Sequence, residues 1–181
     1  MNEYAGLAMV VVSWIAGVYL VSKWRGTRAM SISQHAASAS GASKFFAGTL
    51  ILAGFAFYYW QMTWFASELQ LSGAFQLLLT ASFIGQVVAA VVPDTQGWNR
   101  KIHRVAAYAM AVLYVPISYL ILTSQNFSLF TTALCVICIS YMVLAWFLFF
   151  FVKKSVNYYL IFQSLYIVCF QLVILTTAYV S

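Results

Sequence analysis

The residues best suited to chemistry in this chain lie in two polar segments. Ser33 and His35 lie in the first segment, and Asp94 and His103 flank the second. Two imidazoles and a carboxylate can hold a metal ion while leaving one position open for water. Asp94 and His103 can instead act as an acid–base pair on a lipid ester. The candidate catalytic residues are therefore Asp94 and His103, with Ser33 and His35 in support.

A structural role for the same residues is the simpler interpretation, and we predict no metal. The sequence lacks the His-x-x-x-His and His-Glu-x-x-His spacings of helical zinc sites. His35 lies in a segment expected to be mobile, and loosely held ligands bind metals poorly. His103 would then order the start of a helix by bonding Asp94 or a loop carbonyl. Of these two partners, we expect the contact with Asp94.

Three basic residues around His103 predict a site for a lipid phosphate. Arg100, His103 and Arg104 are spaced i, i+3 and i+4, so they share one helix face, and Lys101 is adjacent in sequence. A helix N-terminus adds free N–H donors and a positive dipole end, which also favour an anion. Ordinary anchoring to anionic headgroups accounts for the same residues equally well.

Membrane-spanning helices must position these residues. Of 181 residues, 64% are hydrophobic and 7% are charged, whereas a soluble domain has about 25% charged residues. Each of six apolar runs has the roughly 20 residues that cross about 30 Å of hydrocarbon as a helix. The sequence therefore predicts an all-α, polytopic membrane protein with a single domain over residues 1–181. Its transmembrane helices are predicted at about 4–22, 45–66, 71–92, 104–123, 128–151 and 157–180.

The basic residues predict the orientation of these helices. All nine fall in the first, third and fifth connections: Lys23, Arg25, Arg28, Lys44, Arg100, Lys101, Arg104, Lys153 and Lys154. Because cytoplasmic segments retain positive charge, both termini are predicted outside, in a multi-pass protein of the inner (plasma) membrane. The net charge of +6 suits anionic headgroups, so membrane lipids and not nucleic acid are the expected partners.

The polar side chains predicted within the bilayer core are uncharged. They include Gln61, Gln76, Gln86, Gln163 and Gln171. Such residues usually bridge helices, at about 0.6 kcal/mol each, although a continuous polar path would suit a neutral solute. A haem needs imidazoles that face each other inside the bundle, whereas both histidines are expected at the interface. No cofactor is predicted.

Three other segments carry expectations. The aromatic-rich run 55–65 could line a lipid or isoprenoid groove, but anchoring and helix packing are the favoured interpretation. Residues 36–43 are a low-complexity tract of small residues, which predicts a mobile loop or a short, loose surface helix. Pro116 is expected to kink its helix, with Ser118 as a partner for the freed backbone groups.

Two pairs of segments resemble a known family. Residues 92–94 (Val-Pro-Asp) end one predicted helix, and residues 102–107 (Ile-His-Arg-Val-Ala-Ala) open the next. This pattern resembles the bacterial six-helix proteins of the domain-of-unknown-function 998 family. Residues 30–33 (Met-Ser-Ile-Ser), followed by 46–48 (Phe-Ala-Gly), are similar to the Ile-Ser segment of that family and of the related DRAM-type membrane proteins.

The resemblance implies six helices, with Asp94 and His103 at matched motif positions. The sequence departs from the pattern at Val92, where phenylalanine is usual, and at Gln34, where an acid is expected. The role of the family is itself poorly defined, with lipid or membrane-trafficking associations among relatives. The resemblance therefore implies a fold and not an activity.

The sequence thus predicts an integral membrane protein of undefined activity that binds lipid or a partner membrane protein. Its polar site is expected at the cytoplasmic face. Two alternatives stay open: a lipid-headgroup hydrolase or transferase that uses Asp94 and His103, and a transporter of a neutral solute. The sequence predicts neither an enzymatic activity nor an oligomeric state.

Overall fold

The computed structural model describes residues 3–24, 26–152 and 157–180. Arg25, Lys153 and Lys154, three of the predicted topological determinants, lie outside this part of the chain. Within the described residues the regular structure is entirely helical, and six helices are long and apolar enough to cross a membrane. The predicted all-α, six-span membrane fold is therefore confirmed.

Long helices that form the spans and a few short helices follow one another along the chain. In chain order they are α1 (Ala5–Lys23), α2 (Ile32–Ala37), α3 (Ser40–Trp60), the π-helix η1 (Gln61–Phe65), α4 (Ala66–Glu68), α5 (Gly73–Val91), α6 (Gly97–Leu122), α7 (Leu129–Phe151) and α8 (Tyr159–Tyr179). α3, η1 and α4 form one continuous span. The short helix α2 lies outside the set of spans.

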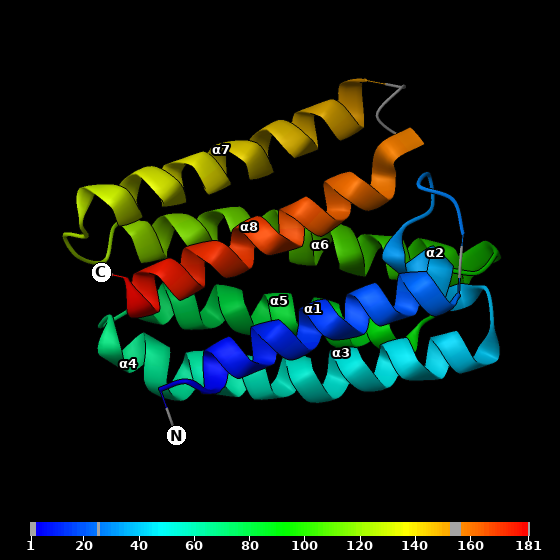
Figure 1. The fold of residues 1–181 in the computed structure, drawn as a ribbon, viewed down its shortest axis with the longest axis horizontal. Coiled ribbons are helices and arrows are strands. Elements are labelled where there is room, and N and C mark those ends of the chain that lie inside the picture. The colour runs from blue at the N-terminus through cyan, green and yellow to red at the C-terminus, as the bar shows by residue number, and fades with distance from the viewer. Residues whose placement is uncertain (1–2, 25, 153–156, 181) are drawn as a thin grey trace.

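The helices form a bundle with two distinct ends. α1 packs on α3, α3 on α5, α5 on α6, and α7 on α8 (Figure 1). Both termini lie at one end, which we call the terminal end (Figure 1). α2 lies at the opposite end, which we call the basic end because it carries the described basic residues: Lys23, Arg28, Lys44, Arg100, Lys101 and Arg104.

Two spans begin earlier than the sequence predicted. α3 begins at Ser40, inside the tract of small residues, and α6 begins at Gly97. The predictions, at 45 and 104, followed the apolar runs, but a helix can extend past the membrane where its residues are small or charged. Arg100 and His103 therefore lie on the first turns of α6, as their spacing predicted.

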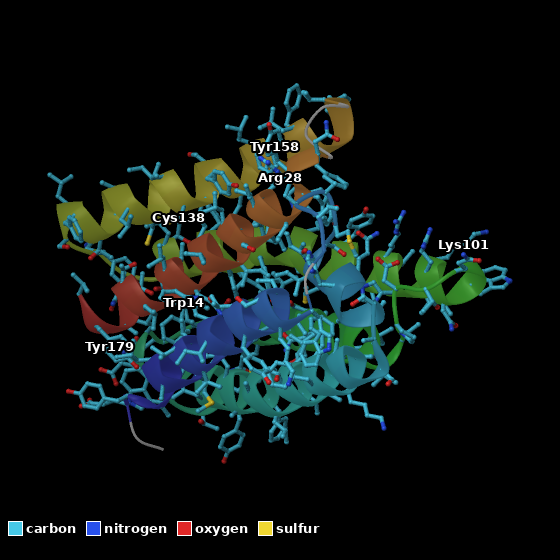
Figure 2. All side chains as sticks on the ribbon, turned by 45° about the vertical axis from the view of Figure 1, so that its right-hand side comes forward. Trp14, Arg28, Lys101, Cys138, Tyr158 and Tyr179 are labelled. Atoms are coloured by element: carbon cyan, nitrogen blue, oxygen red, sulfur yellow. The ribbon has the colours of Figure 1, made fainter. Side chains whose placement is uncertain are left out.

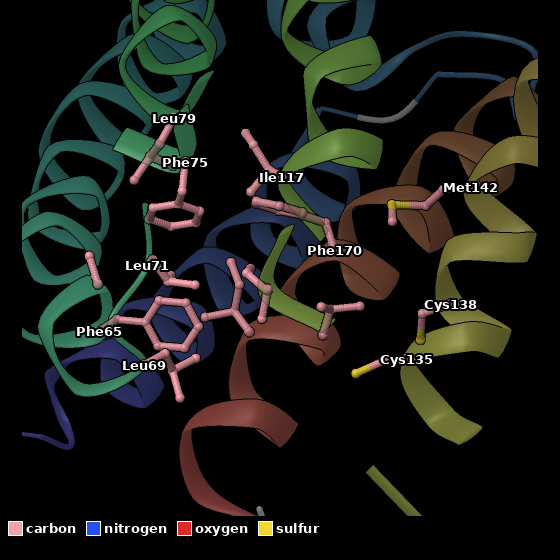
Figure 3. Close-up of a cluster of buried hydrophobic side chains, with 14 of the residues drawn as sticks. Phe65, Leu69, Leu71, Phe75, Leu79, Ile117, Cys135, Cys138, Met142 and Phe170 are labelled. Atoms are coloured by element: carbon pink, nitrogen blue, oxygen red, sulfur yellow. The ribbon is translucent and has the colours of Figure 1, made fainter. Parts of the chain in front are cut away.

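The packed core fills the terminal half of the bundle (Figure 3). Trp60, Phe65 and Phe75 are fully buried there. Phe170 of α8 stacks on Tyr114 of α6, with ring centroids 3.7 Å apart. Near the basic end the corresponding buried cluster is small and rests on Leu20, Ala36 and Ala42. The two halves are therefore packed differently.

The residue predicted to satisfy the backbone near Pro116 does not do so. Proline lacks an N–H, so the carbonyl that it leaves without its helical donor is that of Val112, four residues before it. The preceding carbonyl, that of Ala111, accepts a hydrogen bond at 2.6 Å from the Tyr166 hydroxyl of α8. The predicted partner, Ser118, is fully buried, and its hydroxyl makes no hydrogen bond to the described residues. Ser118 follows Pro116, on the wrong side of the freed carbonyl.

Candidate functional site

Asp94 is held between two arginines at the basic end. The turn after α5 buries its side chain, and its Oδ1 lies 3.5 Å from Arg100 Nε and 3.8 Å from Arg104 Nε. Arg100 Nε also donates to the Thr95 carbonyl at 2.6 Å. The predicted shared face of the two arginines is therefore present. It fastens the turn between α5 and α6 onto the first turns of α6.

His103 bonds a loop carbonyl and not Asp94. Its Nδ1 lies 2.7 Å from the Val92 carbonyl oxygen. A carbonyl can only accept, so Nδ1 carries the proton, and in the neutral ring Nε2 holds the acceptor lone pair. The expected hydrogen bond between Asp94 and His103 is absent among the described residues. The structure instead has the loop-carbonyl bond that the structural interpretation allowed.

Asp94 and His103 nevertheless line one small pocket together with Ser33. Its volume is about 10 Å³, which is the space of roughly one water molecule. The Ser33 hydroxyl bonds the Ser31 hydroxyl at 2.9 Å. The arrangement can therefore hold a water between an imidazole and a carboxylate, but it has no room for a lipid ester beside them.

α2 is a firmly held helix and not a mobile loop. Ser31 caps it, accepting from the Gln34 N–H, while the Gln34 side chain accepts from the Ser31 N–H. His35, which is 2% exposed, donates from Nδ1 to the Trp24 carbonyl at 3.1 Å. Of the two alternatives predicted for this connection, a mobile loop or a short surface helix, residues 32–37 form the short helix, and its capping box lies just before the tract of small residues at 36–43. The ring of His35 lies apart from the pocket of Asp94 and His103.

The three ligands considered for a metal do not come together. Within the described residues no group of three or more His, Cys, Asp or Glu side chains could hold a metal ion. His35 faces the segment around Gly26 and Met30. A three-ligand site built from His35, Asp94 and His103 is therefore not formed.

The predicted phosphate ligands are divided between two environments. Arg100 and Arg104 face the Asp94 carboxylate, so an internal anion already occupies the position predicted for a phosphate. Lys101 lies 4.9 Å from the centre of the exposed Trp98 ring. Figure 2 shows Lys101 at the far tip of the basic end. Trp98 and Lys101 together resemble an interfacial anchor.

A much larger cavity lies inside the bundle. Its volume is about 380 Å³, and it is lined by residues of α1, α2, α3, η1, α5, α6 and α8. Along α6 its wall runs from His103 to Tyr114, which corresponds to about 16 Å at 1.5 Å per residue. Ser33 and His103 line both this cavity and the small pocket of Asp94. The cavity therefore begins beside the sequence-predicted site and extends into the bundle.

Three of the five glutamines bridge helices as predicted. Gln86 of α5 donates from Nε2 to the Leu50 carbonyl of α3 at 2.8 Å. Gln163 of α8 accepts from the N–H of Ile32 at 2.9 Å. A third bridge, between the α1 Trp14 Nε1 and the α8 Gln171 Oε1, is 2.6 Å long. All three glutamines also line the cavity, together with Trp14.

Gln61 differs from these bridging residues. Its Nε2 is 3.4 Å from the Phe57 carbonyl of its own helix, and its Oε1 has no hydrogen-bond partner among the described residues. It lines the cavity at the start of η1. The feature of the sequence that pointed to this part of the cavity was the aromatic run 55–65. Within this run Phe57 and Tyr58 line the cavity, whereas Trp60 and Phe65 belong to the packed core. Periodicity alone could not separate these two roles.

Comparison of the chain with protein-family models, with curated proteins and with solved structures finds no match. The resemblance to the domain-of-unknown-function 998 family therefore stays a prediction. The function has to be argued from the geometry of the site.

Proposed function

We propose that this multi-pass membrane protein binds a single-chain, uncharged amphiphile in the cavity between α1, α3, α5, α6 and α8. The observation that carries the proposal is the cavity itself, about 380 Å³ within the membrane-spanning part of the bundle. Small-molecule sites are typically concave, mostly apolar and about 300–1,000 Å³ in volume, with a few polar groups. The proposal retains the lipid binding expected from the sequence and moves the site from the surface into the bundle.

The lining favours an uncharged ligand. Among the described residues that line the cavity there is no Asp, Glu, Lys or Arg. A charged head group would lose its hydration without gaining a counter-ion, and burial of an unpaired charge is strongly unfavourable. The amides of Gln61, Gln86, Gln163 and Gln171 offer hydrogen bonds to a neutral polar group instead.

The dimensions favour a single chain. The cavity wall spans about 16 Å along α6 and about 24 Å along α3, from Phe45 to Gln61, within the roughly 30 Å hydrocarbon thickness. Its modest volume over that length makes it narrow, as an extended alkyl or isoprenoid chain requires. A phospholipid with two acyl chains is several times larger.

The two alternatives have weaker support. A headgroup hydrolase would need substrate space that Asp94 and His103 share, and the pocket that both line is about 10 Å³, whereas the larger cavity is lined by His103 but not by Asp94. A transporter would need a path through the terminal half, where Trp60, Phe65 and Phe75 are fully buried in packed core.

Basic residues on the cytoplasmic side would place the Asp94 end of the cavity nearest the cytoplasm, in the inner membrane.

Glycine substitutions provide the test. An added Cβ at Gly17, on the cavity wall, or at Gly48, away from the cavity, would meet no atom within 4 Å. Gly17→Phe should fill the cavity, whereas Gly48→Phe makes the same change elsewhere. Protein purified in mild detergent is extracted, and the released single-chain amphiphiles are quantified by mass spectrometry. We expect about one per chain in wild type and Gly48→Phe, and a large loss in Gly17→Phe. Equal content in both variants would contradict the proposal.

A further inference from the structure

We propose that the Gln61 carbonyl oxygen is the head-group site of this cavity and that it accepts a hydrogen bond from a hydroxyl of the bound amphiphile. This inference rests on the proposed function and specifies the chemical class of its ligand. Gln61 is 2% exposed and lines the cavity, and its Oε1 has no hydrogen-bond partner among the described residues. The ligand is thus a long-chain or isoprenoid alcohol.

The identity of the two amide atoms follows from their surroundings. Nε2 faces the Phe57 carbonyl at 3.4 Å. Exchanging the amide atoms would set two acceptors against each other, so the oxygen must be the atom left without a partner. A buried carbonyl that accepts no hydrogen bond is unfavourable, and structures retain few such groups. A donor supplied by a ligand removes that defect.

Gln61 contrasts with the other glutamines of the described chain. Gln86, Gln163 and Gln171 each bond a neighbouring helix or segment, and Gln76 is exposed. Gln61 also opens the π-helix η1. Single π-helical turns within α-helices are uncommon and recur at functional sites. An acceptor held inside the bundle at such a turn is better explained by a ligand than by helix packing.

The acceptor selects among neutral head groups. A hydroxyl can donate to Gln61 Oε1, whereas an ether, an ester or a ketone presents only acceptors. Gln61 lies at the end of α3 nearest the termini, and His103 lines the cavity near the basic end. The hydroxyl would therefore lie towards the terminal end, and the chain would extend from Gln61 towards His103.

The test compares three probes of equal chain length: dodecanol, dodecyl methyl ether and dodecane. Each competes with tritiated dodecanol for the purified full-length protein in mild detergent. We expect the ether to bind wild type about tenfold more weakly than the alcohol, because one hydrogen bond is lost. In Gln61→Met the alcohol should fall to the affinity of the ether. Gln76→Met, the matched control on the exposed face of α5, should keep the preference.

The outcomes separate this inference from the proposed function. Equal affinity of alcohol and ether for wild type would overturn the role of Gln61 while leaving a ligand in the cavity. Dodecanol binding that is absent, or that Gly17→Phe leaves unchanged, would overturn the proposed function itself. The comparison of alcohol with ether uses wild-type protein, so it decides the question even if Gln61→Met fails to fold.

Discussion

At the scale of single residues, Gly54 allows α5 to bond α3. A Cβ at Gly54 would lie 1.8 Å from Gln86 Nε2, the atom that donates to the Leu50 carbonyl. The clash involves the far end of a flexible side chain, so Gln86 can turn away. Doing so breaks its bond to α3. Position 54 therefore requires glycine, because the Gln86 amide approaches the backbone of α3 closely there.

Gly54→Ala should accordingly be less stable than its control, Gly48→Ala, which meets open space. Both changes gain helix propensity, so the difference isolates the lost Gln86 bond, about 1–3 kcal/mol in the free energy of unfolding. Unfolding titrations in mixed micelles measure this difference. In a Gln86→Ala background the two alanine variants should become equivalent. A cost that persists there would show that Gln86 is not its cause.

Tyr166 connects three helices through one hydroxyl. It accepts from Trp146 Nε1 of α7 at 3.1 Å and donates to the Ala111 carbonyl of α6 at 2.6 Å. The Ala111 carbonyl lies one residue before Val112, whose carbonyl loses its helical donor at Pro116. The hydroxyl therefore ties α6 to α7 and α8 one turn before the proline.

Removal of this hydroxyl should destabilise the fold without changing its core volume. We expect Tyr166→Phe to lose about 1–2 kcal/mol of unfolding free energy. Tyr119→Phe, at an exposed position of the same helix as Pro116, should change stability little. Thermal unfolding in one detergent compares the two. Equal melting temperatures would mean that the hydrogen bond from Tyr166 to the Ala111 carbonyl does not stabilise the bundle.

At the scale of elements, α2 and the early part of α6 line the cavity near the basic end, and the turn between α5 and α6 lies just before this part of α6. The N–H of Ile32 bonds Gln163 of α8, and Ser33 lines the cavity beside His103. The turn is held by Asp94 between Arg100 and Arg104. Since the arginines are nearly half exposed, solvent screens this interaction, and the burial of Asp94 is what gives it weight.

Asp94→Asn should therefore destabilise the protein by about 1–3 kcal/mol, because two guanidinium groups then lose their common counter-charge. Glu68→Gln, at an exposed carboxylate, is the matched control and should change little. Unfolding at low and high salt measures the effect, which should shrink as salt screens the pairs in wild type. If Asp94→Asn matched the control, the turn would not depend on the ion pairs.

Comparison of the predicted helices with the observed ones shows which features of the fold sequence patterns can predict. The six spans follow from apolar length, which lipid enforces on every helix. Apolar length does not predict where α3 and α6 begin, because Ser40 and Gly97 precede the apolar runs. α2 was missed as a firm element because its stability comes from the Ser31–Gln34 capping box and burial of His35. Neither is visible in hydropathy.

The same limit applies to the site. Sequence drew attention to Asp94 and His103 because ionisable residues are rare in this chain. It could place them at one membrane face, but not choose between Asp94 and the Val92 carbonyl as partner of His103. The cavity depends on how the helices that line it pack against one another, which is a property of the fold and not of any motif. Gln61 appeared only as one glutamine among several.

At the scale of the whole molecule, the packed core lies in the terminal half of the bundle, and the cavity extends from His103 near the basic end to Gln61 at the end of α3 nearest the termini. Both termini lie at the terminal end (Figure 1). The described basic residues lie at the other end, as the sequence pattern predicted for one membrane side. A single orientation in the membrane therefore determines the side of every connection.

A reporter active only outside the cytoplasm, fused after the C-terminus, should be active, because positive charge is retained on the cytoplasmic side. The same reporter inserted between α5 and α6, near Thr95, should be silent. Activity of both fusions would indicate mixed orientation. A silent C-terminal fusion together with an active fusion near Thr95 would show that the protein has the opposite orientation, with the Asp94 end of the cavity outside.

The central claim is that the cavity holds a single-chain amphiphile, and locating a heavy-atom label tests it most directly. A structure determined with bromododecanol bound should show the bromine signal between α1, α3, α5, α6 and α8, in one site per chain. The signal should disappear in Gly17→Phe and persist in Gly48→Phe. Bromine found only on the outer surface of the bundle, or found in the cavity of Gly17→Phe as well, would contradict the account.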